Sequence, residues 1–534
     1  MASSSLIAVN NLNETIGSFK SKVDVKIDSV NTSTNSIKVT TDKMYAKVEE
    51  FKQNMINNEE KQLAHENILR IDQILKEQFG DHERIRKTVM GVVRDFDINL
   101  VRNNTIQEIS EELWITSSRY WLSYALMSIT AWINDYREVA ENALSECVRR
   151  DPVKASLFFC LFNLRFGRNQ VAQDWFFEYL KTLDPKVMHQ ESAILLEAYL
   201  NGLFGTDKEL ENSVNNVIKN WIAELNANKE IAEGLVRDYQ KYIQLLPSAK
   251  ECHYEALQQF CLNYEDIRKS YANISKYEKL ISEIEAMDVE LEEQTEANYK
   301  SRIDAVLINL ISNYDAEELD LKNQQAYFNY VIDNGGKVEE AEVQYEEYQR
   351  IQNESFNVGK RMVEWAVYDD AEQTDVHVKK FGLQNTKEWF KTAIENWALV
   401  LQKRQPLDYR LSIDTWTGVT NGADQKEQIQ NMTEYYKNNK FQLMYVNTYN
   451  IAAVIILILS IGLVFVTPYS LVATAVSLAF LIFRIYKANK EYPARMNASL
   501  GCLNACMMEL ADYRQYYSEA KDKKDVLISK IDHL

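Results

Sequence analysis

The chain has 534 residues, of which 46% are hydrophobic and 26% are charged, and its formal net charge at pH 7 is −18. This acidic excess argues against nucleic-acid binding, which depends on clustered Lys and Arg. Only 6 prolines and 15 glycines interrupt the chain, so we expect a mainly α-helical fold with long helices, because both residues are costly inside a helix.

Residues 1–113 are predicted to form amphipathic helices with a coiled-coil-like pattern. Apolar side chains recur at every seventh position, at Val9, Ile16, Val23, Val30, Ile37, Met44 and Phe51. One stripe of this kind needs a partner helix to cover it, so these residues are our candidates for self-association. A β-hairpin around residues 31–35 is the alternative, because residues 23–27 and 37–39 alternate between apolar and polar. The seven-residue repeat runs across that turn and favours the helix.

Residues 114–246 are predicted to form a helical-repeat domain. Two Asp-Pro pairs, Asp151-Pro152 and Asp184-Pro185, are separated by about one 34-residue repeat length, and each follows an amphipathic segment. This arrangement resembles the tetratricopeptide pattern, in which paired helices pack closely and a proline ends the second helix. The opening Trp, Leu-Gly and Tyr signature of that pattern is absent. The resemblance implies tandem helical hairpins and a protein-binding surface.

Residues 247–375 are expected to form long antiparallel helices that reverse at Asn334-Gly335-Gly336. Residues 376–444 are predicted to be a small Trp-rich segment that begins with a helix containing Trp389 and Trp397. Alternating residues from Tyr409 to Ile413 then predict one short strand, with a turn at Asn421-Gly422.

Residues 445–487 are predicted to form a two-helix transmembrane hairpin. The runs 451–466 and 471–483 carry no charge and are separated by Thr467-Pro468-Tyr469-Ser470. One crossing of a bilayer needs about 20 apolar residues, so both arms are short. A single kinked helix and a buried core hairpin are the alternatives. The residues expected to insert are Ile451, Leu457, Phe465, Pro468, Leu471, Phe480 and Phe483.

Basic residues flank the two uncharged runs on both sides. Lys437 and Lys440 precede them, and Arg484, Lys487, Lys490 and Arg495 follow them. The positive-inside rule then predicts that both termini lie on the cytosolic side of the cytoplasmic membrane. Residues 488–534 are expected to be a cytosolic helix that packs back on the body. The N-terminus has no basic region followed by an apolar stretch, so no signal peptide is expected.

No motif of a catalytic, metal or phosphate site is present, so we expect a protein that is not an enzyme and binds no cofactor or metal. Cys502 and Cys506, four residues apart, are expected to be small core residues. The predicted function is a membrane-anchored cytosolic scaffold or adaptor, a homo-oligomer whose partners are the lipid bilayer and other proteins. An α-helical pore-forming protein that inserts residues 450–486, or a membrane-shaping hairpin protein, are the alternatives.

Overall fold

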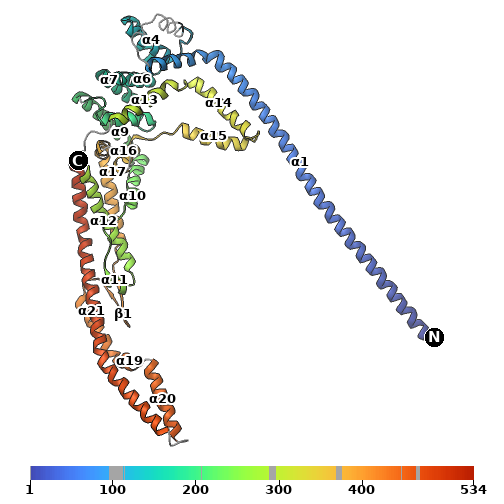
Figure 1. Cartoon of the computed structure of the whole chain (residues 1–534), viewed down its shortest axis with the longest axis vertical. Coiled ribbons are helices and arrows are strands. Elements are labelled where there is room, and N and C mark those ends of the chain that lie inside the picture. Colours follow the sequence, from blue (N-terminus) through green and yellow to red (C-terminus); the bar gives the residue numbers. More distant parts are fainter. Residues whose placement is uncertain are drawn as a thin grey trace. The chain divides into compact units, whose positions relative to one another are not determined.

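The computed structural model describes residues 2–94, 112, 115–205, 207–287, 296–368, 376–446, 448–464 and 470–534. These residues are mostly helical, as predicted (Figure 1). They divide into two units, each built from two stretches of chain. Unit 1 contains Met1–Thr182 and Asp304–Ser355, and unit 2 contains Leu183–Ile303 and Phe356–Leu534.

Unit 1 is organised along one long helix, α1 (Ala2–Arg94). The helix over residues 9–51 is confirmed and the alternative β-hairpin is wrong. The C-terminal half of α1 packs against α14 (Ala316–Asp333). Ile71, Leu75 and Phe79 form the centre of this seam and contact Leu321 and Phe328. Their spacing of four residues places them on one face of the helix, which explains why this half of α1 is covered.

The predicted chain reversal at Asn334-Gly335-Gly336 is confirmed. It joins α14 to α15 (Val338–Gln352), and both glycines have positive φ, +66° at Gly335 and +88° at Gly336. There is also no room for a side chain at position 336, because a Cβ there would overlap the backbone carbonyl of Asn57 in α1. The turn therefore reverses the chain and also brings it against α1.

The remainder of unit 1 contains two successive helical pairs. The first pair is α4 (Trp121–Ile133) with α5 (Arg137–Arg150), and the second is α6 (Pro152–Arg165) with α7 (Asn169–Thr182). Asp151-Pro152 ends α5 and begins α6. The Asp151 carboxylate accepts a hydrogen bond from the Lys154 amide at 2.9 Å, and Pro152 occupies the first turn, where its missing N–H costs nothing. The helix α13 (Glu296–Ser312) contributes residues to both units.

Unit 2 is a bundle of helices with one small β-hairpin. Its helices are α8 (Gln190–Leu200), α9 (Lys208–Ala227), α10 (Lys229–Leu245), α11 (Glu255–Phe260), α12 (Tyr264–Ala286), α16 (Val358–Val367), α17 (Val376–Arg404), α18 (Gln425–Asn438), α19 (Lys440–Tyr445), α20 (Thr448–Val464) and α21 (Ser470–His533). Trp389 and Trp397 of the predicted Trp-rich helix are buried in α17. Gly359 of α16 lies against Trp389, where an added Cβ would be 3.2 Å from the indole.

The predicted strand at Tyr409 to Ile413 is confirmed as β1 (Tyr409–Ile413). It pairs antiparallel with a second strand, β2 (Trp416–Thr420), which the sequence pattern did not predict. The turn between them contains Asp414, whose φ is +54°, rather than Asn421-Gly422. Gly422, with φ of +77°, instead lies where the chain leaves β2 for α18.

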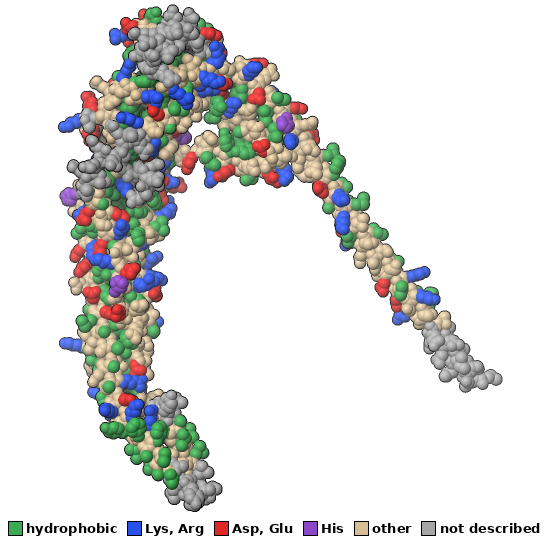
Figure 2. All heavy atoms as spheres, viewed as in Figure 1, with side chains coloured by type: hydrophobic (Ala, Val, Ile, Leu, Met, Phe, Trp, Pro, Cys, Tyr) green, Lys and Arg blue, Asp and Glu red, His purple; other side chains and the backbone are tan. Residues whose placement is uncertain are grey.

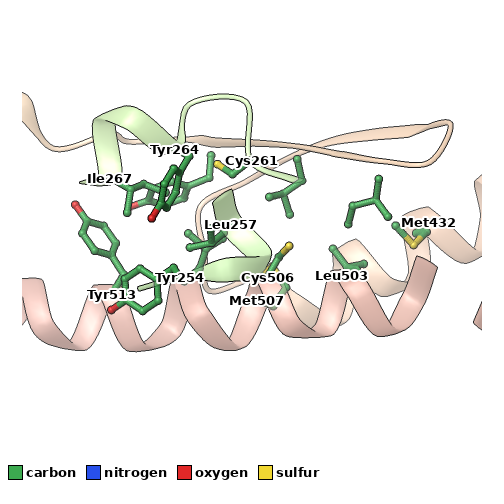
Figure 3. Packing of buried hydrophobic residues seen from close by; sticks show 14 of the residues in the cluster. Tyr254, Leu257, Cys261, Tyr264, Ile267, Met432, Leu503, Cys506, Met507 and Tyr513 are labelled. Carbon is green, nitrogen blue, oxygen red and sulfur yellow. The ribbon is translucent and has the colours of Figure 1, made fainter. Parts of the chain in front are cut away.

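A buried cluster joins this β-hairpin to α11, α12, α18 and α21 (Figure 3). Leu257 from α11, Met432 from α18 and Leu503 from α21 are fully buried there. Leu510 and Tyr513 continue the same face of α21. The prediction that residues 488–534 pack back on the body as a helix is confirmed.

The predicted transmembrane hairpin corresponds to α20 and the start of α21. Helix α20 has 17 residues, about 25 Å at 1.5 Å per residue, which is short of a hydrocarbon core of about 30 Å. The uncharged part of α21 begins at Ser470 and ends before Arg484. Within the part of the chain that the structure describes, no helix is both long and apolar enough to cross a membrane. The predicted transmembrane hairpin and the placement at a cytoplasmic membrane are therefore wrong.

Candidate interaction surfaces

The residues predicted to mediate self-association lie along the N-terminal half of α1. Six of them form a surface that we call the α1 stripe: Ile16, Val23, Val30, Ile37, Met44 and Phe51. Their exposed fractions run from 37% at Val23 to 66% at Ile37 and Phe51. Val9 lies in the same helix, but its side chain is outside the described residues.

Other exposed apolar side chains widen the α1 stripe. Ile27, Val48 and Met55 each follow a stripe residue by four positions, and Phe19 follows Ile16 by three. Residues three or four apart are neighbours on a helix surface, so these side chains widen the stripe at its two ends, over residues 16–30 and 44–55. Around Ile37 the neighbouring positions are Ser33, Thr34, Thr40 and Thr41. An exposed band of this kind is unusual on a monomeric protein and typically marks an interface.

The α1 stripe faces away from the seam with α14. An α-helix turns by about 100° per residue, so Met44 lies roughly 160° around the helix axis from Ala64, which is buried against the α14–α15 hairpin. Extending that seam toward the N-terminus would therefore leave the α1 stripe uncovered. A different partner is needed to bury it.

The centre of the α1 stripe lies in a stretch that is intrinsically weak as a helix. Its Ser and Thr side chains bond back to the backbone within the helix: Thr34 Oγ1 donates to the Val30 carbonyl at 2.8 Å and Thr40 Oγ1 to the Ser36 carbonyl at 2.7 Å. Such residues have low helix propensity because they compete with the backbone's own hydrogen bonding. A partner helix would supply the stability that this stretch lacks.

A second apolar surface lies on α20 and residues 470–486 of α21, which we call the apolar hairpin. In Figure 2 hydrophobic side chains gather over this part of the chain. Ile451, Phe480 and Phe483, which were predicted to insert into a bilayer, are 48%, 50% and 59% exposed, and Leu457 is half-buried. Leu471 lies in α21, with its side chain outside the description. Phe465 and Pro468 lie outside the described residues.

The exposed residues of the apolar hairpin cover most of each helix. On α20 they are Ile451, Val454, Ile455, Ile456, Ile458, Leu459 and Ile461; on α21 they are Val472, Val476, Leu478, Phe480, Ile482, Phe483, Ile485 and Tyr486. At about 100° per residue, each set spans an arc of roughly 220°. The small residues Ala453 and Ser460 are buried. At the base of the hairpin, Arg484 Nε donates to Asn450 Oδ1 at 3.0 Å.

Two successive helical pairs in unit 1 enclose a pocket of about 240 Å³. Apolar and aromatic side chains line it, among them Trp132 of α4, Phe159 of α6 and Trp175 of α7. Arg168, in the turn between α6 and α7, places its guanidinium 3.9 Å from the centroid of the Trp132 ring. Sequence reasoning missed this site. The only signal was the aromatic richness of the stretch, which does not show which rings remain exposed.

The buried cysteines are poor candidates for nucleophiles. Burial raises the pKa of the Cys147 and Cys160 thiols far above their usual range, and it raises the pKa of Cys506 to about 12. These thiols stay protonated near neutral pH, whereas the thiolate is the reactive form. Cys506 is buried in the core cluster and Cys502 packs against it, in line with the predicted role as small core residues.

Among the described residues, no group of three or more His, Cys, Asp or Glu side chains is placed to hold a metal ion. What these residues do present is two apolar surfaces and one aromatic pocket with a cation at its edge. Exposed apolar surfaces and apolar pockets are candidate sites of contact with other molecules. No protein-family model, no curated protein and no solved structure matches this chain.

Proposed function

We propose that this chain is a non-enzymatic helical scaffold that self-associates, with the α1 stripe as the surface between copies. The observation that supports this most directly is the position of the stripe. It is apolar and exposed, and it lies on the side of α1 opposite the seam with α14. A stripe with a seven-residue repeat fits the equivalent stripe of a second helix, as in coiled coils.

Burial of the apolar side chains is the contribution that favours such pairing. Fully burying a large apolar side chain stabilises a complex by about 1.5–3 kcal/mol. Two copies together bring twelve described stripe residues, twice the six on one chain. Association costs about 4–15 kcal/mol in lost freedom and ordering. The stripe side chains are 37–66% exposed, so pairing supplies part of this burial energy toward the cost of association.

The apolar hairpin supplies a second surface for contact between copies. Its described residues between Asn450 and Phe483 are uncharged, so neighbouring hairpins meet without the repulsion expected from a chain whose net charge is −18. An apolar arc of roughly 220° on each helix is too wide for one flat partner to cover. Bundling with more than one neighbouring hairpin covers it.

A pair of matched double variants tests the role of the α1 stripe. V23E/I37E places two carboxylates within the stripe. V25E/V39E also introduces two glutamates, at two exposed valines that each lie about 160° around the helix from the counterpart in the stripe. Light scattering after size-exclusion chromatography of the full chain should give a multiple of the chain mass for the wild type and for V25E/V39E, and a smaller mass for V23E/I37E. A monomeric wild type, or equal masses for both variants, would contradict the proposal.

A further inference from the structure

The pocket between the two helical pairs of unit 1 has apolar walls and an open, aromatic rim. Ile129, Leu144, Phe162 and Trp175 contribute to the walls. At the rim, Trp132 is 49% exposed and Val171 is 43% exposed. An exposed tryptophan beside an arginine is the combination that dominates binding energy at protein interfaces. A pocket of about 240 Å³ has room for one large apolar side chain rather than for a drug-sized ligand.

Arg168 gives this pocket a charge. Gly167, with φ of +69°, turns the chain out of α6 and places Arg168 just before α7. The side chain of Arg168 forms no ion pair or hydrogen bond with any residue that the structure describes; its contact is with the face of Trp132. Partial burial lowers the pKa of its guanidinium. A partly desolvated guanidinium that makes no ion pair with the described residues is a feature that a carboxylate ligand would satisfy.

We propose that this pocket binds a peptide segment of a partner protein in which an apolar side chain stands next to an acidic one. The apolar side chain fills the pocket and the carboxylate pairs with Arg168. Glu141 also lines the pocket. Its negative charge would repel a second carboxylate of the bound peptide that lay close to it. The preferred segment therefore carries one acidic residue beside the apolar anchor, rather than an acidic run.

Two small probes separate the roles of charge and shape. Acetyl-Phe-Asp-amide carries the proposed pair of side chains, and acetyl-Phe-Asn-amide has nearly the same shape without the charge. Ligand-observed NMR titrations against the full chain should show saturable binding of the Phe-Asp probe. The Phe-Asn probe should bind about two- to fivefold more weakly, because it cannot form the ion pair with the partly exposed guanidinium of Arg168.

Variants assign the effect to named residues. Arg168→Gln should remove the preference for the Phe-Asp probe, and Arg168→Lys should restore part of it, because Lys keeps the charge without the planar fork. Trp132→Ala should weaken the binding of both probes. Arg137→Gln is the matched control, because Arg137 is an exposed arginine of the same unit that does not line the pocket, and it should bind both probes as the wild type does.

Three results would overturn the proposal: no saturable binding of either probe, equal affinity for both probes, or an unchanged preference in Arg168→Gln. Circular dichroism of each variant identifies any loss of folding. The V23E/I37E variant should bind the Phe-Asp probe normally. A failure of self-association and a failure of peptide binding can therefore be told apart.

Discussion

Arg86 of α1 and Glu318 of α14 form a two-point ion pair inside unit 1. Both guanidinium nitrogens, Nη1 and Nη2, donate to the carboxylate at 2.7 Å, and the two side chains are only 10% and 4% exposed. His82, one turn earlier on α1, places Nδ1 3.6 Å from the same carboxylate, and its ring stacks on Tyr120 at 4.0 Å. This cluster fixes the register of α1 on α14 in a way that the apolar contacts around it cannot.

Breaking this pair from one side should be costly. Glu318→Gln leaves the Arg86 charge buried without a counter-charge, which typically destabilises by about 3–5 kcal/mol. Replacing both partners by apolar residues, as in R86M/E318L, should cost less than either single change, because no charge is then stranded. Hydrogen exchange of the α14 amides in the three variants measures the effect. A double variant less stable than both single variants would contradict this account.

The pKa of the Glu318 carboxylate leads us to expect that the protein loses stability in acid. Burial raises the pKa of Glu318, but the nearby His82 ring and the Arg86 guanidinium outweigh burial and hold the pKa below its usual range. A group with a depressed pKa stabilises the fold above its unfolded pKa, and that stabilisation is lost as the pH falls through the folded pKa. We expect exchange at α14 to accelerate below about pH 4. In Glu318→Gln this part of the pH dependence should disappear; its persistence would assign the effect to other carboxylates.

The turn between α14 and α15 offers a comparison of two adjacent glycines. Gly335→Ala introduces a Cβ into open space at a positive φ, which costs about 1–2 kcal/mol. Gly336→Ala meets the same strain and also overlaps the Asn57 carbonyl of α1. We expect Gly336→Ala to be the more destabilising, with faster exchange around Asn57. Equal effects of the two substitutions would show that the contact with α1 adds nothing.

The N-terminal half of α1 should be stable only in the assembly. Residues 28–42 are rich in Ser, Thr and Asn, which favour helix formation weakly, and the apolar side chains beside them are exposed. Amide exchange over residues 15–56 should therefore slow as the protein concentration rises, and V23E/I37E should abolish that dependence. The α14 seam serves as the internal reference, because its exchange should not change with concentration. Slow exchange at every concentration would mean that this half of α1 needs no partner.

The long helices and the Asn334-Gly335-Gly336 reversal were predictable because each depends on local chemistry. Few helix breakers and two consecutive glycines carry that information in the sequence itself. The position of the β-turn was not predictable in the same way. Asp414 adopts a left-handed φ and bonds Arg495 of α21 through both carboxylate oxygens. A contact 81 residues along the chain leaves no trace in the local pattern, so Asn421-Gly422 was the stronger signal.

The transmembrane prediction failed for a different reason. Both uncharged runs were already short for a crossing, and their lack of charge was given more weight than their length. In the structure, α20 has only 17 residues, and no described helix is long and apolar enough to cross a membrane. The pocket was missed because a binding site in a helical bundle depends on which rings are left exposed. Trp132 and Trp175 lie in the same aromatic-rich stretch as Phe158, yet Phe158 is fully buried and Trp132 is half exposed. Sequence spacing does not separate the two.

Both units are assembled from separated stretches of chain, so the backbone passes from one to the other three times, after Thr182, after Ile303 and after Ser355. No single cut divides the protein into two independently folding halves. A fragment that ends at Thr182 would lack α14 and α15 and would expose Ile71, Leu75 and Phe79 together with the unpaired Arg86 charge. Truncation mapping would therefore report misfolding and aggregation in place of lost binding, and point substitutions are the reliable way to dissect this molecule.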